Sequence, residues 1–161
     1  MNSKVVVDGY EYLLSHPNPE VAWETGIELT KLIAEPVAAM ALAAGDEKGA
    51  KKDASKEEKA EFDRKLMDGM LKALRGLLTN LEPAKSFAMV KKILSTVEVQ
   101  GEVGKDSKRM LLSDDKMINL HFKGRTGSML KLVVETVRFT HEDFFAAIKN
   151  GIAETMAEIK S

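Results

Sequence analysis

The fold is decided by residues Ile118–Ile159, whose sequence is INLHFKGRTGSMLKLVVETVRFTHEDFFAAIKNGIAETMAEI. Thr140 and Asp143 have the spacing of a helix N-cap and the acidic residue that completes a capping box. On both sides of that junction, apolar side chains recur at the spacing of one helical face: Leu130, Val133, Val134 and Val137, then Phe145, Ile148, Ile152 and Ile159. We therefore expect two amphipathic helices, of which the second begins at Thr140.

Three phenylalanines surround this junction, namely Phe139, Phe144 and Phe145. Aromatic rings dominate buried area wherever they occur, which favours a place in the core. The alternative is a contact surface, in which Phe144 and Phe145 receive an apolar helix of a partner.

The run HFKGRTGSMLKLVVETVRFTHEDFF, His121–Phe145, resembles the C-terminal signature of phage tail assembly chaperones. That signature has a His-Phe-x-Gly-Arg start, a hydrophobic helix, an acidic residue and a double Phe. The position before the acidic pair is often Asn in that family and is His141 here. The matching positions are His121, Phe122, Gly124, Arg125, Asp143, Phe144 and Phe145.

The resemblance implies a chaperone of a long-tailed phage or prophage. Such proteins coat the hydrophobic, helical tape measure protein, keep it soluble and help to recruit tail tube protein around it. They act in the host cytoplasm and are absent from the mature virion, and self-association is compatible with this role. The alternative is a structural tail or neck subunit that stays in the virion and assembles through the same surfaces.

The composition narrows the classes of function. The absence of cysteine excludes disulfides and thiol nucleophiles and is consistent with a reducing cytoplasm. Because 24 basic residues are balanced by 25 acidic ones, no overall positive field attracts nucleic acid or an anionic membrane. The N-terminus lacks the pattern of a signal peptide, and no stretch reaches the roughly 18 apolar residues of a transmembrane helix. We expect a soluble protein that binds neither nucleic acid nor membrane.

Catalytic and cofactor sites are also not expected. The histidines His16, His121 and His141 form no local metal-binding set. The segment Gly124–Gly127 lacks the spacing and the Lys of a phosphate-binding loop, and no serine lies in a nucleophile elbow. We therefore predict no catalytic residues, no metal, no cofactor and no enzymatic activity.

The N-terminal part predicts a small hairpin and then a helix. The β-branched run Lys4–Val7 precedes the turn pair Asp8-Gly9, and tyrosines alternate after it. Asn18-Pro19 has the pattern of a helix start, and Pro36 is expected to kink or end the helix near Ala34, leaving 35–44 as a second short helix or a bent continuation. The expected buried stripe of this region is Trp23, Ile27, Leu32, Ile33 and Val37.

Residues 45–56 are rich in glycine and charged residues, which predicts a flexible linker. The linker separates an N-terminal region, 1–44, from a helical core region, 57–161. We expect the two regions to form one domain overall. Ser55 and Glu58 form a capping box at the start of the next helix. Its apolar stripe is the longest in the chain: Phe62, Leu66, Met70, Leu74, Leu77, Leu78 and Leu81.

A further helix is expected after Glu82-Pro83, ending near a turn region at Gly101 and Gly104. For 108–122 two structures remain open. Alternation of Ile118, Leu120 and Phe122 mildly favours a strand, and the alternative is a helical turn capped by Ser113. The fold class predicted from the whole pattern is mainly α, a compact helical domain with at most a small N-terminal β-hairpin.

The loop His121–Gly127 has two interpretations. Arg125 can offer donors to a partner carboxylate or to carbonyls at a helix end. Alternatively, Gly124 and Gly127 permit a tight turn, Arg125 pairs locally and Phe122 fills the core. The candidate partner-binding residues are Leu66, Met70, Leu74, Leu78, His121, Phe122, Arg125, Phe144 and Phe145.

Overall fold

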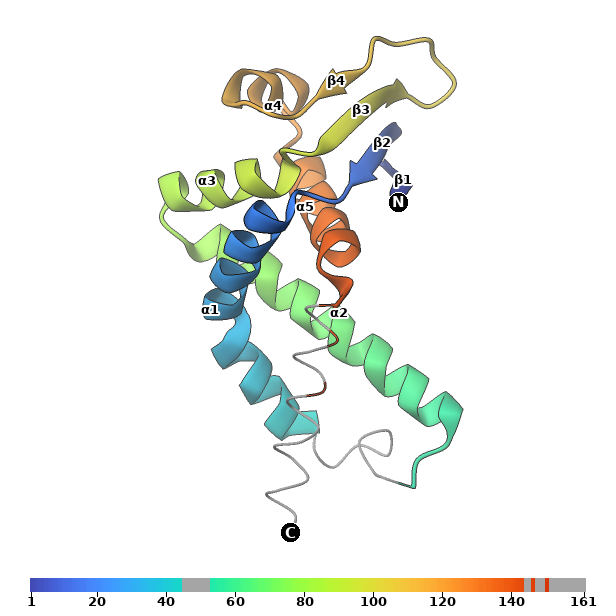
Figure 1. Cartoon of the computed structure of the whole chain (residues 1–161), viewed down its shortest axis with the longest axis vertical. Helices are drawn as coiled ribbons and strands as arrows, with labels where there is room; N and C mark the ends of the chain where they lie inside the picture. Colours follow the sequence, from blue (N-terminus) through green and yellow to red (C-terminus); the bar gives the residue numbers. More distant parts are fainter. Residues whose placement is uncertain (45–52, 144–145, 147–149, 151–161) are drawn as a thin grey trace. The chain divides into compact units, whose positions relative to one another are not determined.

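The computed structural model describes residues 1–44, 53–143, 146 and 150, and for 33–44 and Leu66 it describes the backbone alone. The chain divides into two compact units. The first comprises 1–27 and 78–141, and the second comprises 28–77 and 142–161. Each unit is described below by itself, with elements labelled as in Figure 1.

The first unit contains a four-stranded antiparallel sheet with the strand order β1-β2-β3-β4. The strands are β1 (Asn2–Val7), β2 (Tyr10–Ser15), β3 (Val97–Glu102) and β4 (Met110–Leu111). The predicted hairpin is confirmed, and its turn residues Asp8 (φ 47°) and Gly9 (φ 86°) have the left-handed conformation of a type I′ turn. The fold is therefore helical with a larger sheet than the sequence predicted.

Strand β3 replaces the turn region expected at Gly101. Val97 and Val99 alternate with more exposed residues and pair with β2 at Leu14 and Tyr12. The register shifts by one residue next to Gly101, whose φ of +124° is open to glycine and strained for other residues. A β-bulge at this glycine thus lets β3 continue beside β2.

Helix α5 (Thr126–Thr140) packs against β1, β2 and α3 (Pro83–Leu94). The sheet turns one face toward this core, and the buried residues of α3 are Met89, Val90, Ile93 and Leu94. The residues buried in this unit include Tyr12, Leu14, Val90, Ile93, Leu94, Val97, Val99, Leu132, Val133 and Val137. Within α5, the predicted Leu130 and Val134 are half-buried, and Leu132 and Thr136 lie deeper.

The N-cap predicted at Thr140 is wrong, although a second helix does begin at this junction, at Glu142. Thr140 is the last residue of α5, and its hydroxyl donates to the carbonyl oxygen of Thr136 at 2.8 Å. His141 is the C-cap of α5. The junction is thus where the sequence placed it, but Thr140 closes one helix instead of capping the next. Of the second predicted helix, the structure describes Glu142, Asp143, Ala146 and Asn150, which are helical, and the other residues up to Ile159 lie outside the described residues.

Residues 108–122 form a strand and then a helix. Strand β4 is followed by α4 (Asp115–His121), so the strand favoured for Ile118–Phe122 is wrong. The cap is Asp114 instead of Ser113, and its carboxylate accepts from the Met117 amide at 2.9 Å. A short alternation of apolar residues does not distinguish a strand from two turns of helix.

Helix α1 (Pro19–Ala44) begins where predicted, with the Asn18 side chain accepting from the Val21 amide at 2.9 Å. It continues through Pro36 to Ala44, which agrees with the predicted alternative of a continuation and not with a helix end near Ala34. The buried stripe is wrong in part: Trp23 and Ile27 are 72% and 39% exposed. Thr25 and Leu29 are buried in their place.

Helix α2 (Lys56–Asn80) starts with the predicted capping box. The Ser55 amide donates to Glu58 Oε2 at 2.9 Å, and the Glu58 amide donates to Ser55 Oγ at 3.2 Å. In the second unit this helix buries Met70, Leu71 and Leu74. The described residues contain no helix long and apolar enough to cross a membrane.

Candidate partner-binding surfaces

The loop after α4 is held against the N-terminal hairpin by Arg125. Gly124 has a φ of +72°, which lets the chain turn back. The Arg125 guanidinium then lies 4.1 Å from the centre of the Tyr10 ring and donates to the carbonyl oxygen of His121. Phe122 is buried. These contacts agree with the interpretation in which His121, Phe122 and Arg125 pack locally. Arg125 does bind a carbonyl at a helix end, but that carbonyl is the one of His121 in the same chain.

His121 at the end of α4 is also hydrogen-bonded to Tyr12 of the hairpin, with 2.8 Å between Tyr12 Oη and His121 Nε2. Burial, assisted by the charge of Arg125, lowers the pKa of His121 to about 4. Burial raises the pKa of Tyr12 to about 12. Both groups are therefore neutral at neutral pH, the tautomer of the imidazole sets which of the two donates, and the pair ties α4 to β2.

A second tyrosine extends the cluster to β3. Tyr10 Oη donates to Glu102 Oε1 at 2.9 Å, and Glu102 also pairs with Lys105. Lys105 and then Tyr10 lower the pKa of the Glu102 carboxyl. Among the described residues, no group of three or more His, Asp or Glu side chains could hold a metal ion. The arrangement fits a structural clamp between the hairpin and the α4–α5 loop.

Of the other candidate residues, the structure describes the side chains of three, and all three are buried. Met70 and Leu74 are buried in the second unit, and Leu78 is buried in the first. The side chain of Leu66 and both Phe144 and Phe145 lie outside the description. A partner role for these residues stays a prediction.

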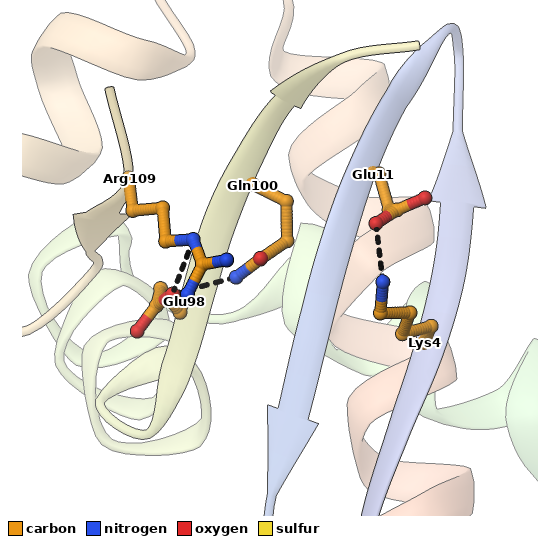
Figure 2. Close-up of polar contacts among 5 residues, drawn as sticks. All are labelled: Lys4, Glu11, Glu98, Gln100 and Arg109. Carbon is orange, nitrogen blue, oxygen red and sulfur yellow. Dashed lines mark hydrogen bonds and ion pairs between the residues drawn. The ribbon is translucent and has the colours of Figure 1, made fainter. Parts of the chain in front are cut away.

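The sheet face opposite the core carries charges that pair with one another (Figure 2). Lys4 binds Glu11 at 3.0 Å. Glu98 accepts from Gln100 at 2.6 Å, and Arg109 approaches the same carboxylate at 4.0 Å. Exposed ion pairs add little stability, but they satisfy one another's charge. This face offers few unpaired charges to a partner.

Comparison with protein families decides the class of protein. A family model described as "Phage tail assembly chaperone protein, TAC" matches residues 8–153. The chain belongs to this family. The match includes the whole run His121–Phe145, and the family is one of assembly chaperones and not of enzymes. No significant match was found among curated proteins or among solved structures.

The sequence analysis did not predict several of the exposed apolar side chains of this chaperone. Trp23 and Ile27 on α1 and Leu120 on α4 point into solvent, with exposures of 72%, 39% and 66%. A signal for Trp23 was present: Glu20 and Glu24 share its helical face, whereas charged residues are rarely buried. The apolar period alone could not reveal which of two faces is turned inward.

Proposed function

We propose that this chain binds the tape measure protein of a long-tailed phage or prophage, keeps it soluble and aids assembly of the tail tube around it. The observation that carries the proposal is the family match over residues 8–153. The tail tube protein is the second proposed partner. The site of action is the host cytoplasm, and the chain is absent from the mature virion.

A tape measure protein presents a long apolar helix before the tube encloses it. Until then, another protein must shield this helix from water. Binding of an amphipathic helix to an apolar surface suits that task. The chain has nine methionines, whose flexible thioethers adapt to irregular apolar partners. The proposed contacts are the stripe around Leu66–Leu78, the loop at His121–Arg125 and the Phe144/Phe145 pair. Contact through Met70 or Leu74 would require the second unit to open, because both are buried.

The test is co-expression with the large coiled-coil-rich protein encoded just downstream, followed by size-exclusion chromatography of the soluble fraction. The proposal expects that protein to be insoluble alone and to co-elute with many copies of this chain. Mass spectrometry of purified virions should find the tape measure protein without this chain. A downstream protein that stays insoluble in the presence of this chain would refute the proposal.

The alternative, a tail or neck subunit retained in the virion, is favoured by one observation. Among the described residues β1 is an edge strand, and it carries three successive valines of which Val6 is 60% exposed. Unpaired strand edges readily pair with another chain. This alternative expects the purified chain to assemble into rings or tubes by itself and to be present in virions.

A further inference from the structure

The first turns of α1 expose a face that combines an aromatic ring with two carboxylates. Glu20, Trp23, Glu24 and Ile27 follow one another at the three- and four-residue spacing of one helical face, and all four are exposed. We call these four residues the Trp23 face. Trp23 is 72% exposed, although indole is among the largest apolar groups a protein can bury.

The opposite side of the helix explains why Trp23 stays outside. Thr25 and Leu29 are 2% and 0% exposed, so they occupy the side of α1 that is turned inward. Rotating α1 to bury Trp23 would bring Glu20 and Glu24 inward with it, and unpaired buried carboxylates are strongly unfavourable. The exposed position of the indole is therefore explained by the carboxylates that share its side of the helix.

The charges of the Trp23 face select the partner. Among the described residues, neither Glu20 nor Glu24 forms an ion pair, unlike the paired carboxylates of Glu11 and Glu98. Carboxylates at the rim of an apolar contact favour a partner with lysine or arginine at the matching positions. Tryptophan is one of the residue types that are enriched among binding hot spots, which cluster near the centre of a contact.

We infer that the Trp23 face is a binding site for an apolar helix flanked by lysine or arginine side chains. The inference rests on the proposed function, because it adds a surface on α1 to the contacts proposed there for the helical client. It also specifies the client segment: large aliphatic side chains cover the indole, and basic residues lie beside Glu20 and Glu24.

The first experiment compares variants in the co-expression assay. Trp23→Ala should lower the amount of soluble client by at least about tenfold, the effect of a hot-spot side chain. The matched control is Leu120→Ala, which removes another exposed apolar side chain of the same unit and should change the yield less than about twofold. Glu20→Lys with Glu24→Lys should also weaken binding, and more at low ionic strength than at high. Thermal melts of each variant alone should match the parent chain.

The second experiment needs no variant of this chain. Trp23 is its single tryptophan, so its fluorescence reports on this face alone. In a complex with a client whose tryptophans are replaced by phenylalanine, acrylamide should quench Trp23 several-fold less than in the free chain. This measurement decides the question if Trp23→Ala fails to fold.

The outcomes separate the two proposals. If the parent chain solubilises the client but quenching is unchanged and Trp23→Ala binds normally, the inference is refuted and the proposed function stands. If the parent chain binds no client, both fail. If Trp23 becomes protected as the chain alone is concentrated, the face binds a second copy, and the inference of a client site is wrong.

Discussion

Gly101 is the position in the sheet where a single added carbon should have the largest effect. Its φ of +124° is sterically strained for a residue with a side chain. A Cβ atom at this position would overlap the Cβ of Ser107 and lie 2.8 Å from its Oγ. Gly101→Ala therefore combines backbone strain in the bulge with a clash against the β3–β4 loop.

The two contributions can be estimated separately. A residue held in an unfavourable backbone conformation costs about 1 to 3 kcal/mol. Forcing an extra carbon into filled space costs about 1 to 3 kcal/mol more. Replacing glycine also restricts the unfolded chain, which returns about 0.4 to 1 kcal/mol. We expect Gly101→Ala to lower the free energy of unfolding by about 1 to 5.5 kcal/mol.

Two further variants isolate the clash. Gly104 has a φ of +79° and nothing within 4 Å of an added Cβ, so Gly104→Ala carries strain without overlap and should cost less than about 2 kcal/mol. Ser107→Gly removes the atoms that a Cβ at 101 would meet, leaving the Ser107 Cα at 3.6 Å. Ser107→Gly should therefore rescue part of the loss in the Gly101→Ala background.

Urea unfolding followed by circular dichroism gives all the free energies needed for a double-mutant cycle. The expected coupling between positions 101 and 107 is about 1 to 3 kcal/mol in favour of the double variant. Strictly additive effects would show that the loop moves aside without loss, and the steric argument would then be wrong.

Three further predictions concern a titrating side chain, a helix cap and a core residue. Because the pKa of His121 is about 4 when folded and near 6.5 when unfolded, its stabilisation is complete above pH 6.5 and is lost as the pH falls toward 4. Urea titrations at pH 7 and 4.5 should show a loss of about 1 kcal/mol, reduced for partial exposure, that His121→Gln does not show. Ser55→Ala should cost about 1 kcal/mol by removing the cap of α2, whereas Ser107→Ala, at an exposed loop position, should be nearly neutral in the same assay. Leu74→Ala should cost about 2 to 5 kcal/mol, and an unchanged melting temperature would mean that Leu74 is a surface contact instead.

Features that depend on neighbouring residues were predicted well from the sequence. The caps at Asn18 and Ser55 and the turn at Asp8-Gly9 each form within about four residues. Their free energy comes from contacts that the local chain makes with itself, so residue type and spacing are sufficient. The family signature was equally legible, because it is a linear pattern of residues.

The tertiary structure alone decided which surfaces meet. The pairing of β2 with β3 joins Leu13 to Glu98, and Tyr12 binds His121 across 109 positions of sequence. No local pattern specifies such partners, so the sequence suggested His121 and Arg125 but not the tyrosines that hold them. Likewise, the spacing of apolar residues shows that α1 is a helix, but it does not show which side is buried. In the structure Thr25 and Leu29 are buried, and Trp23 on the other side is exposed to solvent. Burial is a competition between faces of the same helix, and its outcome depends on what the rest of the chain brings to each face.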